Sequence, residues 1–182
     1  AREKAAEKKL PTKFLLADCR SFSFSQKFST IIFPFNSIAH LPDEKSLMSC
    51  FSCVKQHLLP NGKFILDYIN PRVDLLARTL YSPEFISEFD DPDGDGRIQL
   101  SMSNSYDAAS QINIVKWHYT FLQTNEHYED ELPMRIFFPQ EFDALLRYNG
   151  FTIDAKYGNY DESPFTSSSP KQLLICSKRN KM

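Results

Sequence analysis

Two polar side chains, Asn36 and His40, come shortly after the apolar run Ile31-Ile32-Phe33. The Asn36 side chain offers a carbonyl oxygen and two amide hydrogens, so it can bind a carboxylate or orient an amine; the alternative is a turn residue at a corner of the chain. His40 can take up a proton or bind a substrate, or it can pack at the entry to a helix. An unbroken apolar run is typical of a parallel strand buried on both faces, and ligands bind beyond the carboxyl ends of such strands. The spacing therefore predicts a ligand site after this run.

A second apolar run, residues 14–17, ends in Asp18 and Cys19. It predicts a second strand, over residues 14–18, whose carboxyl end lies at the same edge of the sheet. From the residues alone, Asp18 is an ordinary loop acid or cap. Two strands would thus deliver polar groups to one edge, where open α/β sheets bind their ligands.

The elements that must position these residues follow an α/β order. Apolar residues at helical spacing predict a helix over residues 43–59, which Asp43 can cap and Pro60-Asn61-Gly62 can end. The apolar run within residues 63–69 predicts the next strand. A helix between two such strands is typical of a crossover connection in a parallel sheet.

The second half of the chain changes its pattern at Arg97. Apolar and polar residues alternate there on both sides of a turn at residues 107–110, which predicts an antiparallel hairpin. Gly150 is placed to form the left-handed C-cap of the helix before it. The other expected elements are one or two short helices within residues 73–89, a strand over 134–138, a helix over 139–149, and an antiparallel pair of strands over 151–157 and 173–177.

The composition fits a globular domain without a strongly charged surface. The chain has 182 residues, of which 42% are hydrophobic and 14% aromatic, enough for one packed core. Its formal net charge of -2 gives no general attraction to nucleic acid or to anionic membranes. No apolar run approaches the ~18 residues needed to span a bilayer. The four cysteines form no framework of loop cysteines, which favours reduced thiols and a cytoplasmic location.

Two motifs resemble metal sites, but neither carries a full ligand set. Cys50 and Cys53 have CxxC spacing within a helix and lack a second pair, so we expect two small apolar helix residues. Residues 91–98 match the start of a calcium loop, but position twelve is Met102 where a glutamate is required, and a tight polar turn explains the segment. The four histidines show no metal-ligand spacing, so we expect no metal ion.

One ordered set of segments runs through the whole chain. It consists of Asp18-Cys-Arg20, Asn36-Ser-Ile-Ala-His-Leu-Pro-Asp43, Leu59-Pro-Asn-Gly-Lys-Phe64 and Tyr157-Gly-Asn-Tyr-Asp161. This set resembles class I S-adenosylmethionine-dependent methyltransferases, and its second segment is similar to that of small-molecule N-methyltransferases of the glycine and sarcosine type. The resemblance implies an α/β fold with a Rossmann-like, mostly parallel sheet, an antiparallel C-terminal edge, and a small antiparallel β insertion over residues 97–138.

The resemblance also implies a cofactor, S-adenosylmethionine, and residues that bind it. Asp18 would accept hydrogen bonds from the adenine amino group, and the Cys19 backbone amide would donate to the adenine ring. Phe33 and Phe35, at a strand end, are expected beside the sulfonium, because the face of an aromatic ring attracts a cation.

The partner implied by the resemblance is a small-molecule methyl acceptor. Asn36, His40, Tyr68 and Arg135 are the expected acceptor-binding residues. Arg135 would clamp a carboxylate, or it would merely pair with Glu141 on the surface. No catalytic acid or base is identified, because methyl transfer to a neutral amine chiefly needs the nucleophile aligned with the sulfonium.

One part of the family pattern is missing from the sequence. The glycine-rich loop that cradles the methionine end of the cofactor is not found, and neither is the acidic residue that ends the second strand. Residues 1–9 read as a helix already under way. We therefore expect one methyltransferase domain over residues 1–182 that lacks its first β-α-β unit.

The expected function is transfer of a methyl group from S-adenosylmethionine to a nitrogen or oxygen of a small molecule. One alternative is a non-catalytic α/β fragment or interaction module that cannot bind the cofactor alone. Another is an RNA or protein methyltransferase, for which a basic face would be required that the sequence does not display. The sequence leaves open the identity of the acceptor and the oligomeric state.

Overall fold

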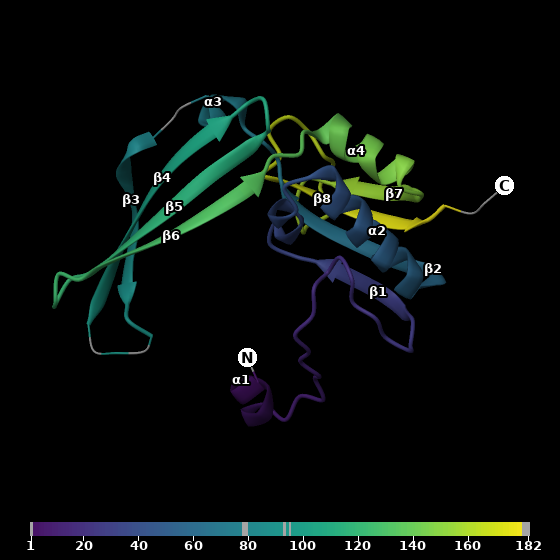
Figure 1. Cartoon of the computed structure of the whole chain (residues 1–182), viewed down its shortest axis with the longest axis horizontal. Helices are drawn as coiled ribbons and strands as arrows, with labels where there is room; N and C mark the ends of the chain where they lie inside the picture. Colours follow the sequence, from purple (N-terminus) through teal and green to yellow (C-terminus); the bar gives the residue numbers. More distant parts are fainter. Residues whose placement is uncertain (1, 78–79, 93, 95, 180–182) are drawn as a thin grey trace.

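The computed structural model describes residues 2–77, 80–92, 94 and 96–179. The described chain contains two four-stranded sheets, ordered β1-β2-β8-β7 and β3-β4-β5-β6. Figure 1 shows the second sheet extending away from the first sheet and its helices.

The first sheet mixes parallel and antiparallel strands. Strand β1 (Phe28–Phe33) pairs parallel to β2 (Leu58–Ile69). Strand β8 (Lys171–Lys178) runs antiparallel to β2 and also to β7 (Phe151–Tyr157). The predicted α/β fold with an antiparallel C-terminal edge is confirmed.

Two helices cover one face of this sheet. In α2 (Glu44–His57), the Asp43 carboxylate accepts a hydrogen bond from the Ser46 amide at 2.8 Å, so the predicted N-cap is confirmed. Helix α4 (Pro139–Tyr148) is followed by Gly150 at φ 83°, the predicted left-handed residue. One core joins these helices to the sheet, and its largest fully buried members include Phe51, Phe64, Phe142, Leu146 and Phe151.

The opposite face of β1 is open in the described chain. Ile31 and Phe33 pack against the core, whereas Ile32 is 56% exposed. The prediction that this strand is buried on both faces is therefore wrong, because α2 and α4 pack on the other face of the sheet.

The second sheet is a long antiparallel meander. It consists of β3 (Leu80–Asp90), β4 (Arg97–Asp107), β5 (Ile112–Phe121) and β6 (His127–Arg135). The β4–β5 hairpin and its turn are as predicted. Of the one or two short helices predicted within residues 73–89, one is confirmed as α3 (Val73–Leu76), and a second is wrong because β3 pairs there with β4. The sheet thus begins before the expected insertion, because cross-strand pairing overrides the local helical pattern.

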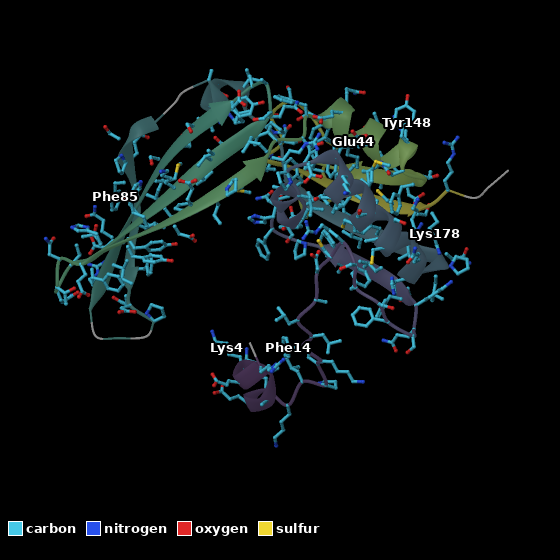
Figure 2. All side chains as sticks on the ribbon, in the orientation of Figure 1. Lys4, Phe14, Glu44, Phe85, Tyr148 and Lys178 are labelled. Atoms are coloured by element: carbon cyan, nitrogen blue, oxygen red, sulfur yellow. The ribbon has the colours of Figure 1, made fainter. Side chains whose placement is uncertain are left out.

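The N-terminal segment departs most from the predictions. Helix α1 (Arg2–Glu7) is present, but residues 14–18 form no strand, and Leu16 is fully exposed. Figure 2 shows Phe14 beside α1 and apart from both sheets. A strand requires a neighbouring strand for its backbone hydrogen bonds, and this segment has none beside it.

Candidate functional site

The corner after β1 is a strained turn held by the end of β2. Phe35 and Asn36 both have left-handed backbones, with φ values of 51° and 58°. The Phe35 amide donates to the Asp67 carboxylate at 3.2 Å, and the Asn36 amide donates to the Asp67 carbonyl at 3.0 Å. The Asn36 side-chain oxygen accepts a hydrogen bond from the Ile69 amide at 2.6 Å. Such a conformation costs about 1–3 kcal/mol at a bulky residue and is typical of functional sites.

Asp67 is the centre of this corner. Its side chain is only 8% exposed, and its carboxylate accepts hydrogen bonds from Lys171 Nζ at 3.1 Å and from the Tyr160 hydroxyl. The Lys171 ammonium also lies 3.7 Å from the centre of the Tyr160 ring. These residues come from three separate parts of the chain, so they tie the tail to the ends of β1 and β2.

Hydrogen bonds and neighbouring charges keep Asp67 and Lys171 ionised. Burial alone would raise the pKa of Asp67, but hydrogen bonds from Tyr160, Lys171 and the Phe35 amide hold that pKa below its ordinary value. Burial alone would lower the pKa of Lys171, but hydrogen bonds to Tyr160 and Asp67 raise it overall. A carboxylate and an ammonium therefore face each other at the strand ends at neutral pH.

Two neighbouring cavities open beside the corner. The smaller, of about 140 Å³, is lined by Phe35, Asn36, Asp67, Ile69, Pro170 and Lys171. The larger, of about 750 Å³, shares Ile69 and Pro170 with it. Helix α3, Ile136 and the serines of residues 167–169 form its other walls. A compartment of this size fits a small organic molecule, with the small cavity holding a single functional group.

Asn70 fixes one wall of the larger cavity. It is buried, and its side-chain amide points to the carbonyls of Thr166, Ser167 and Ser169 at 3.5, 3.4 and 2.9 Å. The Asn70 backbone amide donates to the Pro170 carbonyl at 3.1 Å. The loop before β8 is therefore fastened to the end of β2.

The predicted cofactor residues Asp18 and Cys19 lie in a turn beside α2. The Asp18 carboxylate is exposed and paired with the Arg20 guanidinium at 2.6 Å. Hydrogen bonds from the Arg20 side chain and backbone lower the pKa of Asp18 to about 2, so it is an ionised acceptor at neutral pH. Arg20 also contacts the Ser46 hydroxyl at 3.4 Å, and Cys19 packs against the core.

Two predicted ligand residues belong to the core. Phe33 packs edge-to-face on Phe64, with ring centres 5.4 Å apart. Tyr68 is fully buried; its hydroxyl donates to the Arg135 carbonyl at 2.9 Å and accepts from the Phe137 amide at 3.1 Å. Because side chains alternate along a strand, Tyr68 faces the helices while its neighbour Asp67 faces the site.

The other predicted residues are divided between the site and the structure around it. Arg135 forms an ion pair with Glu141 at 3.1 Å and lies 4.8 Å from the centre of the Phe137 ring. The structure thus has the ion pair that was the alternative to a carboxylate clamp. This pair is largely buried and does not lie on the surface. His40 is exposed at the end of the 3₁₀ turn Ser37–His40. Phe35 is 82% exposed. Of the predicted residues, the structure brings Phe35 and Asn36 together at the corner.

Three site residues were missed by sequence reasoning. Asp67 is signalled by its position at the end of a predicted strand. Tyr160 and Lys171 lie 93 and 104 positions from Asp67 in the sequence, so no local pattern links them to it.

Cys50 and Cys53 are buried residues of α2, as expected. No group of three or more His, Cys, Asp or Glu side chains within the described ranges is arranged to hold a metal ion. The possible calcium loop includes Asp93 and Asp95, which lie outside the described residues. Among the helices of the described residues, none combines the length and apolar character needed to cross a membrane.

Comparison with known proteins identifies the fold. No protein-family model and no curated protein matches the sequence. Among solved structures, an S-adenosylmethionine-dependent methyltransferase from Clostridium acetobutylicum matches 99% of this chain and 70% of its own, with a TM-score of 0.79 and 16% identity. The CcbJ methyltransferase from Streptomyces caelestis matches 98% of this chain and 69% of its own, with a TM-score of 0.78 and 17% identity. The sugar N-methyltransferase KedS8 from Streptoalloteichus matches 97% of this chain and 67% of its own, with a TM-score of 0.69 and 18% identity. The chain therefore has the fold of class I S-adenosylmethionine-dependent methyltransferases.

Proposed function

We propose that this chain provides the methyl-acceptor side of an S-adenosylmethionine-dependent methyltransferase, which transfers a methyl group to a nitrogen or oxygen of a small molecule. The observation that carries the proposal is the strained Phe35-Asn36 corner, which Asp67 holds at the carboxyl ends of two parallel strands. In open α/β sheets, this is the edge at which ligands bind.

The residues at this edge fit the cofactor chemically. S-adenosylmethionine supplies an electrophilic methyl group on a positively charged sulfonium. Phe35 offers an exposed aromatic face, which attracts a cation. Asp18 offers an ionised oxygen that can accept a hydrogen bond from the adenine amino group. The Cys19 backbone amide is the proposed donor to the adenine ring.

Asn36 is the proposed contact to the acceptor. Its side-chain oxygen is occupied by the Ile69 amide, which fixes the orientation of the side chain. Its amide hydrogens have no hydrogen-bond partner among the described residues, and Asn36 lines the small cavity. The Asn36 amide therefore serves to orient the oxygen or nitrogen atoms of an acceptor, and exposed His40 is a candidate second contact. Catalysis then depends on alignment and exclusion of water.

The larger cavity is the proposed site for the body of the acceptor. Its volume of about 750 Å³ fits a small molecule, and its walls combine aliphatic side chains and prolines with the serines of residues 167–169, Asn70, Arg72 and Asp74. KedS8 is described as a sugar N-methyltransferase and MtfA as a glycopeptide N-methyltransferase, which supports an acceptor of the small-molecule class. The four free cysteines suit the reducing conditions of the cytoplasm, our proposed location.

Calorimetry with S-adenosylhomocysteine, the product form of the cofactor, tests this proposal. We expect the 182-residue chain to bind it more weakly than micromolar, and Asp18→Ala to weaken binding by about tenfold or more, because a charged hydrogen-bond acceptor is removed. Asp161→Ala is the matched control, since Asp161 is an exposed acid that bonds only within its own loop. Failure to bind at millimolar ligand would favour the non-catalytic alternative. Equal affinity of the two variants would remove Asp18 from the site.

A further inference from the structure

The second sheet carries a line of three polar side chains that the proposed methyl transfer does not use. Ser103 Oγ lies 2.9 Å from His118 Nε2, and His118 Nδ1 lies 2.9 Å from Glu129 Oε1. These residues come from β4, β5 and β6, which run side by side in Figure 1. A hydroxyl, an imidazole and a carboxylate that are hydrogen-bonded in this order are the groups that activate a serine as a nucleophile.

The strand register brings the three side chains to one face of the sheet. His118 is paired with Ser101 across β4 and β5, and with Glu129 across β5 and β6. Side chains alternate along a strand, so Ser103 shares a face with Ser101 and is a diagonal neighbour of His118. The line of hydrogen bonds therefore depends on the pairing of three strands.

The two hydrogen bonds fix which ring nitrogen of His118 carries the proton. The Glu129 carboxylate only accepts, so the His118 Nδ1 hydrogen donates to it. In the neutral ring, Nε2 is then without a hydrogen and accepts the one from the Ser103 hydroxyl. Ser103 is buried, whereas the His118 side chain is 19% exposed and the Glu129 side chain 65% exposed, so solvent reaches the imidazole.

We propose that Ser103, His118 and Glu129 form an acyl-transfer site that hydrolyses small esters with a good leaving group. Ser103 is the nucleophile, His118 is the general base, and Glu129 is the positioning residue that orients the imidazole. This site lies on the second sheet, so its chemistry involves neither the Phe35-Asn36 corner nor the cofactor.

The reaction balances with water as the second reactant. The Ser103 oxygen attacks the ester carbonyl carbon while its hydrogen passes to His118 Nε2, and the leaving group takes this proton as its bond to the acyl carbon breaks. Water then attacks the acyl group on Ser103 and gives a proton to His118. That proton returns to the Ser103 oxygen as the acyl–serine bond breaks, so one ester and one water give one acid and one alcohol.

The backbone around Ser103 limits the substrates to activated esters. Strand β4 has a partner strand on each side, so its amides are directed to the neighbouring strands and not toward a developing oxyanion. Lys116 is paired with Ser103 in the register, and its ammonium, which forms an ion pair with Glu131 at 2.9 Å, is the positive charge on this face nearest in register to Ser103. A phenolic leaving group, whose bond breaks with little stabilisation of the oxyanion, is therefore the expected kind.

Hydrolysis of p-nitrophenyl acetate by the purified chain tests the proposal. We expect an acetyl group on Ser103, detected by mass spectrometry of its peptide, and release of nitrophenol that is at least about tenfold slower in Ser103→Ala. Ser101→Ala is the matched control and should behave as the wild type. Ser101 is buried on the same face of β4 and lies opposite His118, but the hydroxyl that bonds the ring is that of Ser103.

Diisopropyl fluorophosphate separates a reactive serine from reactive lysines and cysteines. Its P–F bond breaks as the P–O bond to serine forms, and we expect this label on Ser103 in the wild type and in Ser101→Ala, but not in His118→Ala. Glu129→Ala should slow labelling about tenfold. The positioning role of Glu129 also predicts a change in the NMR shifts of the His118 ring nitrogens, from a ring with its hydrogen on Nδ1 to a mixture of both neutral forms.

Several results would overturn the proposal. Acetyl groups found only on lysines or cysteines would do so, as would equal nitrophenol release by wild type and folded Ser103→Ala. Fluorophosphate labelling of Ser101 and Ser103 to the same extent would show that His118 does not activate Ser103. Melting curves check that each variant is folded, and if one is not, the position of the label in the wild-type chain decides.

Discussion

The Asp67 carboxylate accepts a hydrogen bond from the Phe35 amide at 3.2 Å, and this contact joins the carboxyl ends of β1 and β2. It fixes a backbone conformation that a phenylalanine rarely adopts, and it leaves the Phe35 ring 82% exposed. A bulky apolar side chain is thus held out at the edge where the fold binds ligands.

Replacing Asp67 should damage both the corner and the stability of the chain. Asp67→Asn removes the charge that Lys171 and Tyr160 hydrogen-bond, so we expect the free energy of unfolding to fall by about 1–3 kcal/mol. Urea unfolding measures this change. Asp154→Asn is the control, since its ion pair with Lys63 is partly exposed and should contribute less than about 1 kcal/mol. Equal losses in the two variants would contradict the assigned role of Asp67.

The same carboxylate should make stability depend on pH. The pKa of Asp67 in the folded chain lies below its ordinary value of 3.8, so its contribution is present above that value and is lost as the pH falls through the lowered pKa. We expect the melting temperatures of wild type and Asp67→Asn to differ at about pH 7 and to converge as the pH falls below 3.8 and through the lowered pKa. A difference that stays constant over this range would show that Asp67 titrates normally.

Two substitutions at Asn36 separate its structural and binding roles. Asn36→Asp keeps the oxygen that accepts from the Ile69 amide but loses the amide hydrogens, whereas Asn36→Ala loses both. We expect both variants to lower methyl transfer by about tenfold or more, with melting impaired chiefly in Asn36→Ala. Transfer from labelled S-adenosylmethionine to glycine or to an amino sugar measures activity. Wild-type transfer by Asn36→Asp would show that the amide hydrogens do not bind the acceptor.

Because the core covers one face of the first sheet, substitutions on its two faces should differ in their effect on stability. Phe64 is fully buried among Phe33, Phe51 and Phe151, so Phe64→Ala should cost about 3–5 kcal/mol of unfolding free energy. Ile32→Ala on the open face of the same sheet should cost much less. Urea unfolding of the two variants distinguishes these cases, and a similar large loss at Ile32 would mean that its face is covered in solution.

Local sequence signals predicted the elements whose geometry depends on near neighbours. Asp43 caps α2 through an amide three residues away, and Gly150 ends α4 with a backbone conformation suited to glycine. The strand pair β7–β8 follows from two apolar segments near the end of the chain. Each of these features is set within a few residues or by a simple alternation.

Features that depend on distant partners were not predictable in the same way. Residues 14–17 have the apolar character of a strand, but no neighbouring strand completes it, and Leu16 is fully exposed. One or two short helices were predicted within residues 73–89, but pairing with β4 makes residues 80–90 a strand. At the site, Phe35 and Asn36 were found by their position after β1, whereas Tyr160 and Lys171 reach Asp67 only through the folded tail.

The most direct test of the account is to map where the cofactor product binds. Amide chemical shifts of the labelled chain, recorded during titration with S-adenosylhomocysteine, report on each residue separately. We predict shifts concentrated in residues 18–20 and 33–37 and at Asp67, with little change along β4 and β5. Shifts confined to the second sheet, or no saturable shift in the Phe35-Asn36 corner, would contradict a methyl-transfer site at the ends of β1 and β2.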